Sequence, residues 1–424
     1  MGFFFGTDGI RGIVGQELTY SLAIKCGNAL ARLKNGCKIL IGQDTRVSGQ
    51  MILSSVSLGA NLGGAQVTNV GVASTPCISY LTTSLNFDFG VVITASHNPS
   101  EYNGIKIFDS TGRKLSDKQE EMIERYMIKD MVHSYSSLGK TIYKPGLISK
   151  YINYLCSQVG SLKGVNIAID CANGASKNIA KRVFKKLQAT VKFVGMKGGE
   201  NINLECGATY PQKLAEFVKK HNLDYGFCFD GDADRIVMVS KDKIYSGDNI
   251  LYCLALHFGE SVKTVVGTSL TNLGLELALK NKSIMLERAD VGDKFVIEKM
   301  QEKQTWLGGE ESGHIIVSKI LPTGDGLLTA LLLTNIIKNQ NPDLFMHFEA
   351  FPQVMRSVKT ADKLRSMGNE ELSKAISYAS EELAGRGRVL VRPSGTENKI
   401  RIMVESENLA QAQRLVEFIA SKIE

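Results

Sequence analysis

Apolar residues in the first third of the chain follow two spacings in turn, and this alternation predicts an α/β fold. Residues 21–33 and 51–62 place apolar side chains three and four positions apart, which is typical of amphipathic helices. Residues 38–41 and 89–94 are short continuous apolar runs, as expected of strands buried on both faces. Because helices that alternate with such strands cover the faces of one sheet, we expect an α/β unit over residues 1–147.

The same alternation returns after a connector rich in serine, glycine and lysine at 134–146. It predicts a second α/β unit over 148–242 and a third over 243–347. Strands at 388–391 and 400–404 and a helix at 409–423 then indicate a smaller unit over 348–424. A chain of 424 residues exceeds what one hydrophobic core usually supports. We therefore predict an α/β protein with three similar α/β domains and a smaller C-terminal α+β domain.

The first candidate site is residues 94–99, TASHNP, which follow the apolar run at 89–93. In α/β domains ligands bind beyond the carboxyl ends of the strands, so Ser96 would lie at such an edge with His97 and Asn98 beside it. One interpretation makes Ser96 a nucleophile. The other is a simple turn, because serine and asparagine bond their own backbone and proline fixes φ. The hexapeptide alone does not decide between them.

A second candidate is the acidic run 230–235, DGDADR, which leaves the predicted strand 224–229. In an extended segment Asp230, Asp232 and Asp234 would project to one side, where three like charges repel unless a cation lies among them. A ligand set of carboxylates alone favours a hard ion such as Mg²⁺ or Ca²⁺ over zinc. An EF-hand needs glycine and glutamate where this chain has Arg235 and Lys241, so a calcium-sensing loop is excluded.

Two further segments could bind a sugar phosphate. In residues 308–314, GGEESGH, Glu311 and Ser312 could bond sugar hydroxyls and His314 could act as an acid or base near neutral pH, although a surface hairpin explains the glycines equally well. In the last unit a loop with two arginines and two hydroxyls could form an anion-binding nest, comprising Arg392, Ser394, Gly395, Thr396 and Arg401.

Two polar loops near the start each join an arginine to small residues. They are 6–12, with Arg11, and 44–49, with Arg46. An arginine fork binds a phosphate through two parallel bonds, whereas the small residues suit a tight turn. Both interpretations stay open for both loops.

Composition and charge narrow the possible partners and compartment. The 50 basic and 43 acidic residues leave a net charge of +7, which we expect to be spread along the chain, and we find no basic, aromatic-interleaved block typical of nucleic-acid binding. The longest apolar run, 327–337, is about half of the ~20 residues that cross a bilayer, so it predicts a buried helix and no membrane partner. The eight cysteines form no C-x-x-C pair, which indicates reduced thiols in a cytoplasmic protein.

Five motifs, in this order, resemble those of the α-D-phosphohexomutase superfamily. They are residues 6–12 (GTDGIRG), 94–99 (TASHNP), 230–235 (DGDADR), 309–314 (GEESGH) and 392–397 (RPSGTE). The finer wording is similar to that of bacterial phosphoglucosamine mutases, notably at 266–274 (VGTSLTNLG), 291–293 (VGD), 307–309 (LGG) and 323–326 (TGDG). The resemblance covers essentially the whole chain.

The resemblance implies mixed sheets in the three α/β domains, a C-terminal domain that closes over the substrate, and a central cleft between the four. It implies the interconversion of glucosamine 6-phosphate and glucosamine 1-phosphate through a phosphoserine enzyme and a 1,6-bisphosphate, for amino-sugar nucleotide and cell-wall precursor synthesis. Mg²⁺ would be held by Ser96, Asp230, Asp232 and Asp234. The partners would be the phosphorylated hexosamine, its bisphosphate, and a kinase or phosphodonor that activates the enzyme.

Roles for the remaining candidates follow from the same resemblance. Catalytic residues besides Ser96 would be His97, Lys106, Arg235 and His314, for proton transfer and phosphate contact. Substrate would be bound by Arg11, Glu311, Ser312, Arg392, Ser394, Gly395, Thr396 and Arg401.

The chain departs from the usual motifs at three positions. Ala233 stands where glycine is commoner and is expected to be harmless because it is no ligand; Asn398 replaces a usual proline. Glu311 stands where phosphoglucosamine mutases usually have glutamine, which keeps phosphoglucomutase/phosphomannomutase open as the rival activity. A sugar-phosphate binding protein on a decayed mutase fold is a more distant alternative, against which this chain retains Ser96 and all three aspartates.

Overall fold

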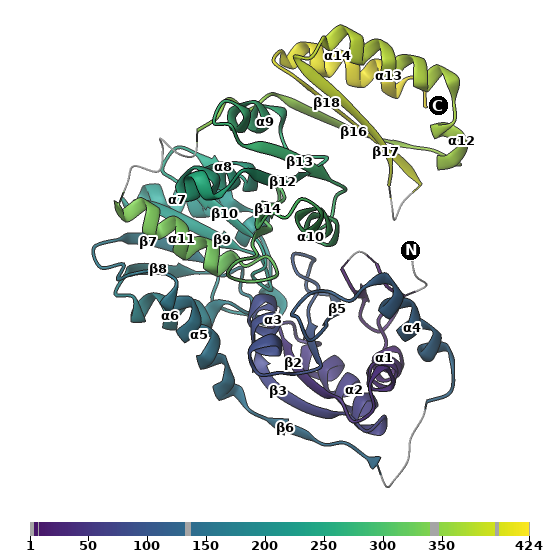
Figure 1. The fold of residues 1–424 in the computed structure, drawn as a ribbon, viewed down its shortest axis with the longest axis vertical. Helices are drawn as coiled ribbons and strands as arrows, with labels where there is room; N and C mark the ends of the chain where they lie inside the picture. Colours follow the sequence, from purple (N-terminus) through teal and green to yellow (C-terminus); the bar gives the residue numbers. More distant parts are fainter. Residues whose placement is uncertain (1–3, 7, 132–136, 340–346, 395–397, 424) are drawn as a thin grey trace.

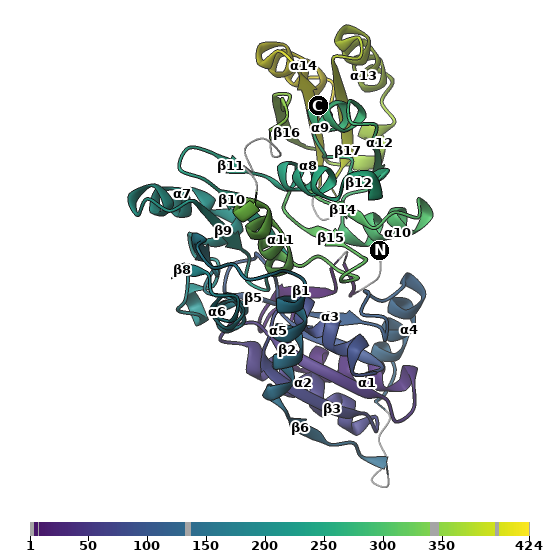
Figure 2. The same cartoon turned by 60° about the vertical axis from the view of Figure 1, so that its left-hand side comes forward.

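The computed structural model describes residues 4–6, 8–131, 137–339, 347–394 and 398–423. Four sheets follow one another along the chain, and Figures 1 and 2 show them as successive bodies, from the N-terminal body in purple to the C-terminal body in yellow. The predicted fold class is confirmed. The exact boundaries at 147, 242 and 347 stay a prediction, and we note that strand β11 (Ile244–Tyr245) pairs within the second sheet.

The first sheet has six strands in the order β1-β5-β4-β2-β3-β6 and is mixed, because β5 runs antiparallel to both of its neighbours. Its strands are β1 (Ile10–Ile13), β2 (Lys38–Gln43), β3 (Gln66–Val72), β4 (Phe89–Ile93), β5 (Tyr102–Phe108) and β6 (Thr141–Tyr143). Its helices are α1 (Tyr20–Leu33), α2 (Gly49–Leu62), α3 (Thr75–Ser84) and α4 (Asp117–Ile128). The strand β5 has no counterpart among the predicted elements.

Alternating side chains of this sheet enter two different cores. Ile39, Val91 and Ile93 face a core shared with α1, α2 and α4, whereas Leu40 and Val92 face α3 and a second core that continues into the next two domains. The pair α1 and α2 packs closely because Gly27 and Gly59 lack a Cβ. A Cβ there would lie about 2 Å from the carbonyl oxygens of Val56 and Ile24 on the facing helix.

The second sheet has the order β11-β10-β9-β7-β8, with parallel pairs around β7 and antiparallel pairs around β10. Its remaining strands are β7 (Asn166–Asp170), β8 (Thr190–Val194), β9 (Tyr225–Phe229) and β10 (Ile236–Val239). Its helices are α5 (Ile148–Ser157), α6 (Lys177–Lys186) and α7 (Pro211–Lys220). Short 3₁₀ turns cover Pro145–Leu147, Gly199–Asn201 and Gly207–Thr209, and another, Gly259–Ser261, follows in the third domain.

The third sheet has the order β13-β12-β14-β15 and is also mixed. Its strands are β12 (Thr264–Thr268), β13 (Met285–Ala289), β14 (Leu307–Gly309) and β15 (Ile315–Val317). Its helices are α8 (Gly247–Phe258), α9 (Leu273–Lys280), α10 (Asp293–Glu302) and α11 (Gly326–Asn339). The long apolar run lies in α11, which is buried against β9 and β10 of the second sheet. Among the described residues, no helix is long and apolar enough to cross a membrane.

The C-terminal domain is a three-stranded antiparallel sheet, β16-β18-β17, with its own core under two long helices. It comprises β16 (Gln353–Lys359), β17 (Gly387–Pro393), β18 (Lys399–Ser406), α12 (Lys363–Met367), α13 (Glu370–Leu383) and α14 (Leu409–Ala420). The last helix ends three residues earlier than predicted. In both views this domain lies against the third domain, on the far side from the first.

Candidate active site

The turn that carries Ser96 follows β4, as the sequence predicts. Ser96 is 1% exposed and has a φ of 50°, in the left-handed region that costs a non-glycine residue about 1 kcal/mol or more. Its backbone N–H donates to Oγ1 of Thr94 over 3.0 Å. Strain of this kind persists only where surrounding contacts hold the backbone in place, so the turn keeps the Ser96 hydroxyl in a fixed position.

The buried side chain of Arg46 braces this turn. Its guanidinium donates to the carbonyl oxygens of Ser96 at 3.0 Å and Asn98 at 2.8 Å, and also to those of Pro99 and Tyr102. The same guanidinium pairs with Asp44 at 3.0 Å, and both side chains are fully buried. Of the two interpretations left open for loop 44–49, the structure supports the turn: Arg46 is committed to protein atoms.

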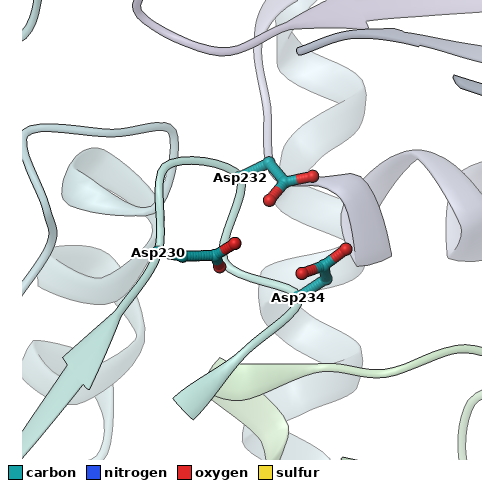
Figure 3. Close-up of side chains that lie close together, drawn as sticks. All are labelled: Asp230, Asp232 and Asp234. Atoms are coloured by element: carbon teal, nitrogen blue, oxygen red, sulfur yellow. The ribbon is translucent and has the colours of Figure 1, made fainter. Parts of the chain in front are cut away.

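The three aspartates of the metal-loop candidate converge as predicted, but by a different backbone path. Residues 230–235 form a tight loop in which Ala233 has a φ of 59°. The prediction of an extended conformation for this segment is therefore wrong. The left-handed conformation of Ala233 turns the loop between Asp232 and Asp234. Figure 3 shows the side chains of Asp230, Asp232 and Asp234 close together in this loop. One oxygen from each carboxylate lies within 4.8 Å of the others. Ala233 is no ligand, yet it adopts a conformation that glycine adopts more readily.

This loop meets the serine turn from the first domain. The hydroxyl of Ser96 donates to Oδ2 of Asp230 over 2.5 Å, and Oγ1 of Thr75 donates to Oδ2 of Asp232 over 2.6 Å. Asn203 of the second domain donates to the carbonyl oxygen of Ser96 at 2.8 Å. Residues far apart in sequence therefore form one polar cluster at the junction of two sheets.

The ammonium of Lys106 lies inside the cluster. Lys106 is on β5 and donates to Oδ2 of Asp232 and of Asp234, both at 2.8 Å, while Oδ2 of Asp8 lies 3.1 Å away. Although burial alone would lower it, these carboxylates hold the pKa of Lys106 well above its usual value. Lys106 is thus a permanent cation beside the carboxylates, which agrees with a role in neutralising negative charge.

The charge balance differs among the carboxylates. Burial, together with the neighbouring Asp232 and Asp234, raises the pKa of Asp230 well above its usual value. Burial would also raise that of Asp234, but Lys106 and His314 hold the pKa of Asp234 well below it. Two buried oxygens, Oδ1 of Asp232 and Oδ1 of Asp234, have no hydrogen-bond partner. Unsatisfied carboxylate oxygens in an all-oxygen cluster are the donors that Mg²⁺ prefers, so these residues fit a hard cation.

A pocket of about 160 Å³ adjoins the cluster and is lined from three domains. Its walls carry the positive charges of Lys114 and Arg235 and the negative charges of several carboxylates. Its lining residues are Asp8, Lys114, Asp234, Arg235, Val291, Gly292, Asp293, Glu310 and His314. Nζ of Lys114 donates to Oδ1 of Asp293 over 2.6 Å, which links the first and third domains. The mixed charge suits a phosphoryl group together with sugar hydroxyls.

His314 is held between two carboxylates. Its Nδ1 lies 3.7 Å from Oδ1 of Asp234 and its Nε2 lies 3.6 Å from Oδ2 of Asp293. Although burial would lower it, these neighbours raise the pKa of His314 above its usual value. The ring packs on Gly324, where an added Cβ would lie 2.3 Å from Nε2. His314 therefore holds a proton at the pocket wall more readily than a free imidazole would.

His97 lies beside Ser96, and its pKa is shifted in the opposite direction from that of His314. Its Nδ1 lies 3.4 Å from Oγ of Ser96. Burial, reinforced by the Arg235 and Arg11 guanidinium groups, lowers the pKa of His97 to about 4. The imidazole is consequently neutral at physiological pH. Arg11 donates to Oδ1 of Asn98 at 3.1 Å and pairs with Asp8, so it lies on the rim of the serine turn.

The two glutamates of the sugar-loop candidate lie in different surroundings, and sugar binding by Glu311 and Ser312 stays a prediction. Glu310, rather than Glu311, lines the pocket, and its Oε1 accepts from the backbone N–H of Gly292 at 3.1 Å. Glu311 and Ser312 are exposed at the hairpin between β14 and β15. Sequence reasoning missed Asp8, Lys114 and Asp293, although motifs containing Asp8 and Asp293 were recognised.

The C-terminal candidates form a separate group. Arg392 of β17 lies directly opposite Arg401 of β18, and burial followed by the Arg401 charge lowers the pKa of Arg392. The carbonyl oxygen of Ser394 accepts from Lys363 at 2.8 Å. Two arginines paired across strands repel, which favours an anion between them. Gly395 and Thr396 lie outside the described residues, and within the described ranges no hydrogen bond or ion pair joins this group to Ser96 or the aspartates.

Comparison with known proteins gives matches along the whole chain. Models of the phosphoglucomutase/phosphomannomutase family match in four parts: α/β/α domain I at 3–132, domain II at 149–243, domain III at 246–355 and the C-terminal domain at 355–422. A protein of Anoxybacillus flavithermus named phosphoglucosamine mutase is 42% identical over 443 residues, covering 100% of this chain and 99% of the relative.

Solved structures show the same fold at lower identity. A phosphoglucomutase/phosphomannomutase family protein of Burkholderia thailandensis superposes with a TM-score of 0.85 at 20% identity, over 98% of this chain and 96% of that one. N-acetylphosphoglucosamine mutase of Aspergillus fumigatus, in complex with GlcNAc-6P and magnesium, superposes with a TM-score of 0.67 at 16% identity, over 99% and 95% of the two chains.

Proposed function

Since this chain belongs to the phosphoglucomutase/phosphomannomutase family, we propose that its serine turn and aspartate loop act as one phosphoryl-transfer site for glucosamine phosphates. The family resemblance expected from the motifs is confirmed, and the protein is an isomerase of the phosphomutase kind. The proposed reaction is the interconversion of glucosamine 6-phosphate and glucosamine 1-phosphate. The relative from Anoxybacillus flavithermus described above is named for that activity.

One observation carries the proposal: the Ser96 hydroxyl lies 2.5 Å from an Asp230 carboxylate oxygen, beside two more buried carboxylates and a buried lysine. A hydroxyl held rigidly against such a cluster suits a group that accepts and donates a phosphoryl. A serine phosphoester resists water, and a site formed between domains excludes water further.

The reaction proceeds in two transfers. In the first, O1 of glucosamine 6-phosphate attacks phosphorus, the bond from phosphorus to Oγ of Ser96 breaks, and the proton of the attacking hydroxyl is released to the site. The bisphosphate then turns over, and Oγ of Ser96 attacks the phosphoryl group on O6. The bond from phosphorus to O6 breaks, the serine hydroxyl gives up its proton to the site, and O6 takes up a proton to become the hydroxyl of glucosamine 1-phosphate. Atoms and charge balance over the cycle, because the serine regains the phosphoryl group it gave.

The chain's own residues support each transfer. Lys106 stays charged beside the carboxylates, and Arg235 and Lys114 put positive charge around the pocket, so negative charge that develops on the phosphoryl oxygens is stabilised. His314, at the same pocket, adds to this charge when it is protonated. Neutral His97, with Nδ1 3.4 Å from Oγ, can exchange a proton with the serine oxygen.

For the metal we propose Mg²⁺, held by Asp230, Asp232 and Asp234 together with an oxygen on Ser96. When bound, it would neutralise charge on the transferred phosphoryl group. The Aspergillus relative of the same fold is described in complex with magnesium. The buried Oδ1 of Asp232, which has no hydrogen-bond partner, supports the proposal from this chain's side.

Three further elements belong to the proposal. The phosphate that is not reacting would be bound by the C-terminal group, Arg392, Ser394, Gly395, Thr396 and Arg401, and closure of the C-terminal domain would bring this group to the pocket.

The eight cysteines are free thiols, which fits a reducing compartment such as the cytoplasm. First phosphorylation of Ser96 requires a bisphosphate phosphodonor or a kinase.

The substrate is tested by comparing kcat/KM for glucosamine 6-phosphate, glucose 6-phosphate and mannose 6-phosphate at equal Mg²⁺ and bisphosphate. We expect a clear preference for the amino sugar, with residual activity on glucose phosphates because discrimination at one carbon is modest. A neutral sugar phosphate as the better substrate would move the enzyme to the phosphoglucomutase/phosphomannomutase activity and leave the roles of Ser96 and the aspartates unchanged.

A further inference from the structure

An open hollow lies between α5 and α6, on a face of the second domain that the phosphoryl-transfer site does not use. Its volume is about 480 Å³, and its lining residues are Ile152, Asn153, Arg182, Lys185 and Lys186. The two helices pack side by side (Figure 1). None of these residues lines the catalytic pocket, so the hollow is a separate feature of the surface.

The positive charge of the protein is concentrated around this hollow. Our expectation that the net charge is spread along the chain is wrong: residues 137–199 contain eleven lysines and arginines but a single acidic residue, the buried Asp170. The rest of the chain is slightly acidic, so the whole net charge of +7 originates in this stretch. Its basic residues are Lys140, Lys144, Lys150, Lys163, Lys177, Lys181, Arg182, Lys185, Lys186, Lys192 and Lys197.

The cations at the hollow make no ion pair within the described part of the chain. Arg182 donates to the hydroxyl of Ser149 at 2.8 Å and Lys186 donates to Oδ1 of Asn153 at 2.8 Å, both neutral acceptors. The three cationic side chains are exposed, while Val183 and Phe184 of the same helix are buried in the core. The helix thus presents an uncompensated basic face directly at the hollow.

This arrangement opposes helix stability. Lys181 and Lys185 are four positions apart on α6, as are Arg182 and Lys186, and like charges at that spacing destabilise a helix. The helix dipole favours cations only in the last turn, which accounts for Lys185 and Lys186 but not for Lys181 and Arg182. A bound anion would relieve the repulsion.

The shape and chemistry of the hollow favour a small soluble anion. The hollow is shallow and open to solvent, so a small hydrated anion can enter it. No large apolar side chain of α5 or α6 is strongly exposed, so the hollow itself lacks the groups that insert into a membrane or stack on bases, although Leu138, Ile142 and Tyr143 are exposed elsewhere in the basic stretch. Arginine and lysine around an amide instead match the oxygens of phosphoryl groups.

We propose that the hollow between α5 and α6 is a second anion site, which binds a soluble ligand carrying at least two linked phosphoryl groups. Arg182 supplies a two-pronged contact, and Lys185 and Lys186 supply two point charges. The site requires no chemistry at Ser96, and it does not depend on which sugar phosphate the mutase prefers.

The test uses pyrophosphate as the probe and amide hydrogen exchange as the readout on the intact protein. Millimolar pyrophosphate should slow exchange in peptides covering 148–157 and 177–186. The triple variant Arg182→Ala/Lys185→Ala/Lys186→Ala should weaken this binding by about tenfold or more, because each lost contact is charge-assisted. A matched variant, Lys140→Ala/Lys163→Ala/Lys192→Ala, removes equal charge outside the hollow and should retain it.

Mutase turnover should stay unchanged in both variants, which separates this proposal from the proposed function. Absence of protection at α5 and α6, or equal loss in the two triple variants, would overturn the site and leave only diffuse electrostatics. Co-sedimentation with phosphatidylglycerol vesicles distinguishes a lipid headgroup as the source of phosphate. Vesicle binding that needs the three cations, without protection by pyrophosphate, would assign the face to a membrane surface instead.

Discussion

The hydroxyl of Ser96 and the Oδ2 atom of Asp230 lie 2.5 Å apart, although 134 residues separate them in the chain. Ser96 follows β4 of the first sheet and Asp230 follows β9 of the second, so the contact exists only when the two domains are packed together. The active cluster is therefore a property of the domain interface, and the predictions below address what holds each side of it.

Arg46 should act as a positioning residue for Ser96. Arg46→Lys keeps the charge but cannot reach four carbonyl oxygens at once, so we expect roughly a hundredfold loss of kcat from misplacement of the serine. Loss of the buried network should also lower the free energy of unfolding by about 2–3 kcal/mol. Kinetics and calorimetry would measure both effects. The control is Arg125→Lys, an exposed arginine on α4. A variant that loses stability but not kcat would contradict a positioning role.

Metal removal should stop turnover. Because the ligand set is all oxygen, EDTA should abolish activity and Mg²⁺ should restore it. Asp232→Asn should retain the fold and lose about 10²-fold or more in kcat, whereas Asp242→Asn, at an exposed acidic residue, should behave as the wild type. Full activity after thorough chelation would remove the metal from the mechanism.

Gly324 should be required for the placement of His314. In Gly324→Ala the new methyl group would lie 2.3 Å from Nε2, so the ring must move away from Asp234 and Asp293. We expect kcat/KM to fall by about tenfold or more while the domains stay folded. Gly160→Ala is the matched control, because a Cβ at Gly160 meets nothing within 4 Å. Equal kinetics for the two variants would show that the position of His314 is unimportant.

Stability should depend on pH through Asp248, at the start of α8. Burial, with added repulsion from Glu311 and Glu405, raises the pKa of Asp248 from 3.8 to about 7. The folded chain thus keeps a proton that the unfolded chain loses, so this carboxyl lowers stability progressively between pH 4 and 7. Asp248→Asn should melt close to the wild type near pH 4 and above it at pH 8. A difference in Tm that does not grow with pH would contradict this assignment.

Local pattern places Ser96 and the aspartates each at the carboxyl end of an apolar strand, where ligands bind in α/β domains. The strands belong to different sheets, so the meeting of Ser96 with the aspartates was expected only from the family resemblance. The backbone conformation of the aspartate loop could not be predicted from the sequence. The reversal at Ala233 depends on a left-handed residue, and alanine gives no signal for that conformation.

Other members of the site could not be found from local pattern. Lys106 enters through β5, which runs back antiparallel after the turn and was not predicted as a strand. Arg46 gives the same sequence signal whether it binds a phosphate or buried carbonyls. At the sugar loop a hairpin of glycines has no periodicity, so a one-residue difference between Glu310 and Glu311 decides which carboxylate faces the pocket.

The central claim is that Ser96 carries and transfers the phosphoryl group. The most direct measurement is peptide mapping by mass spectrometry of enzyme treated with a sugar 1,6-bisphosphate, before and after addition of glucosamine 6-phosphate. We predict phosphate on Ser96 that disappears with formation of the bisphosphate, and inactivity of Ser96→Ala. Phosphate found only on other residues, or full activity in Ser96→Ala, would contradict the account.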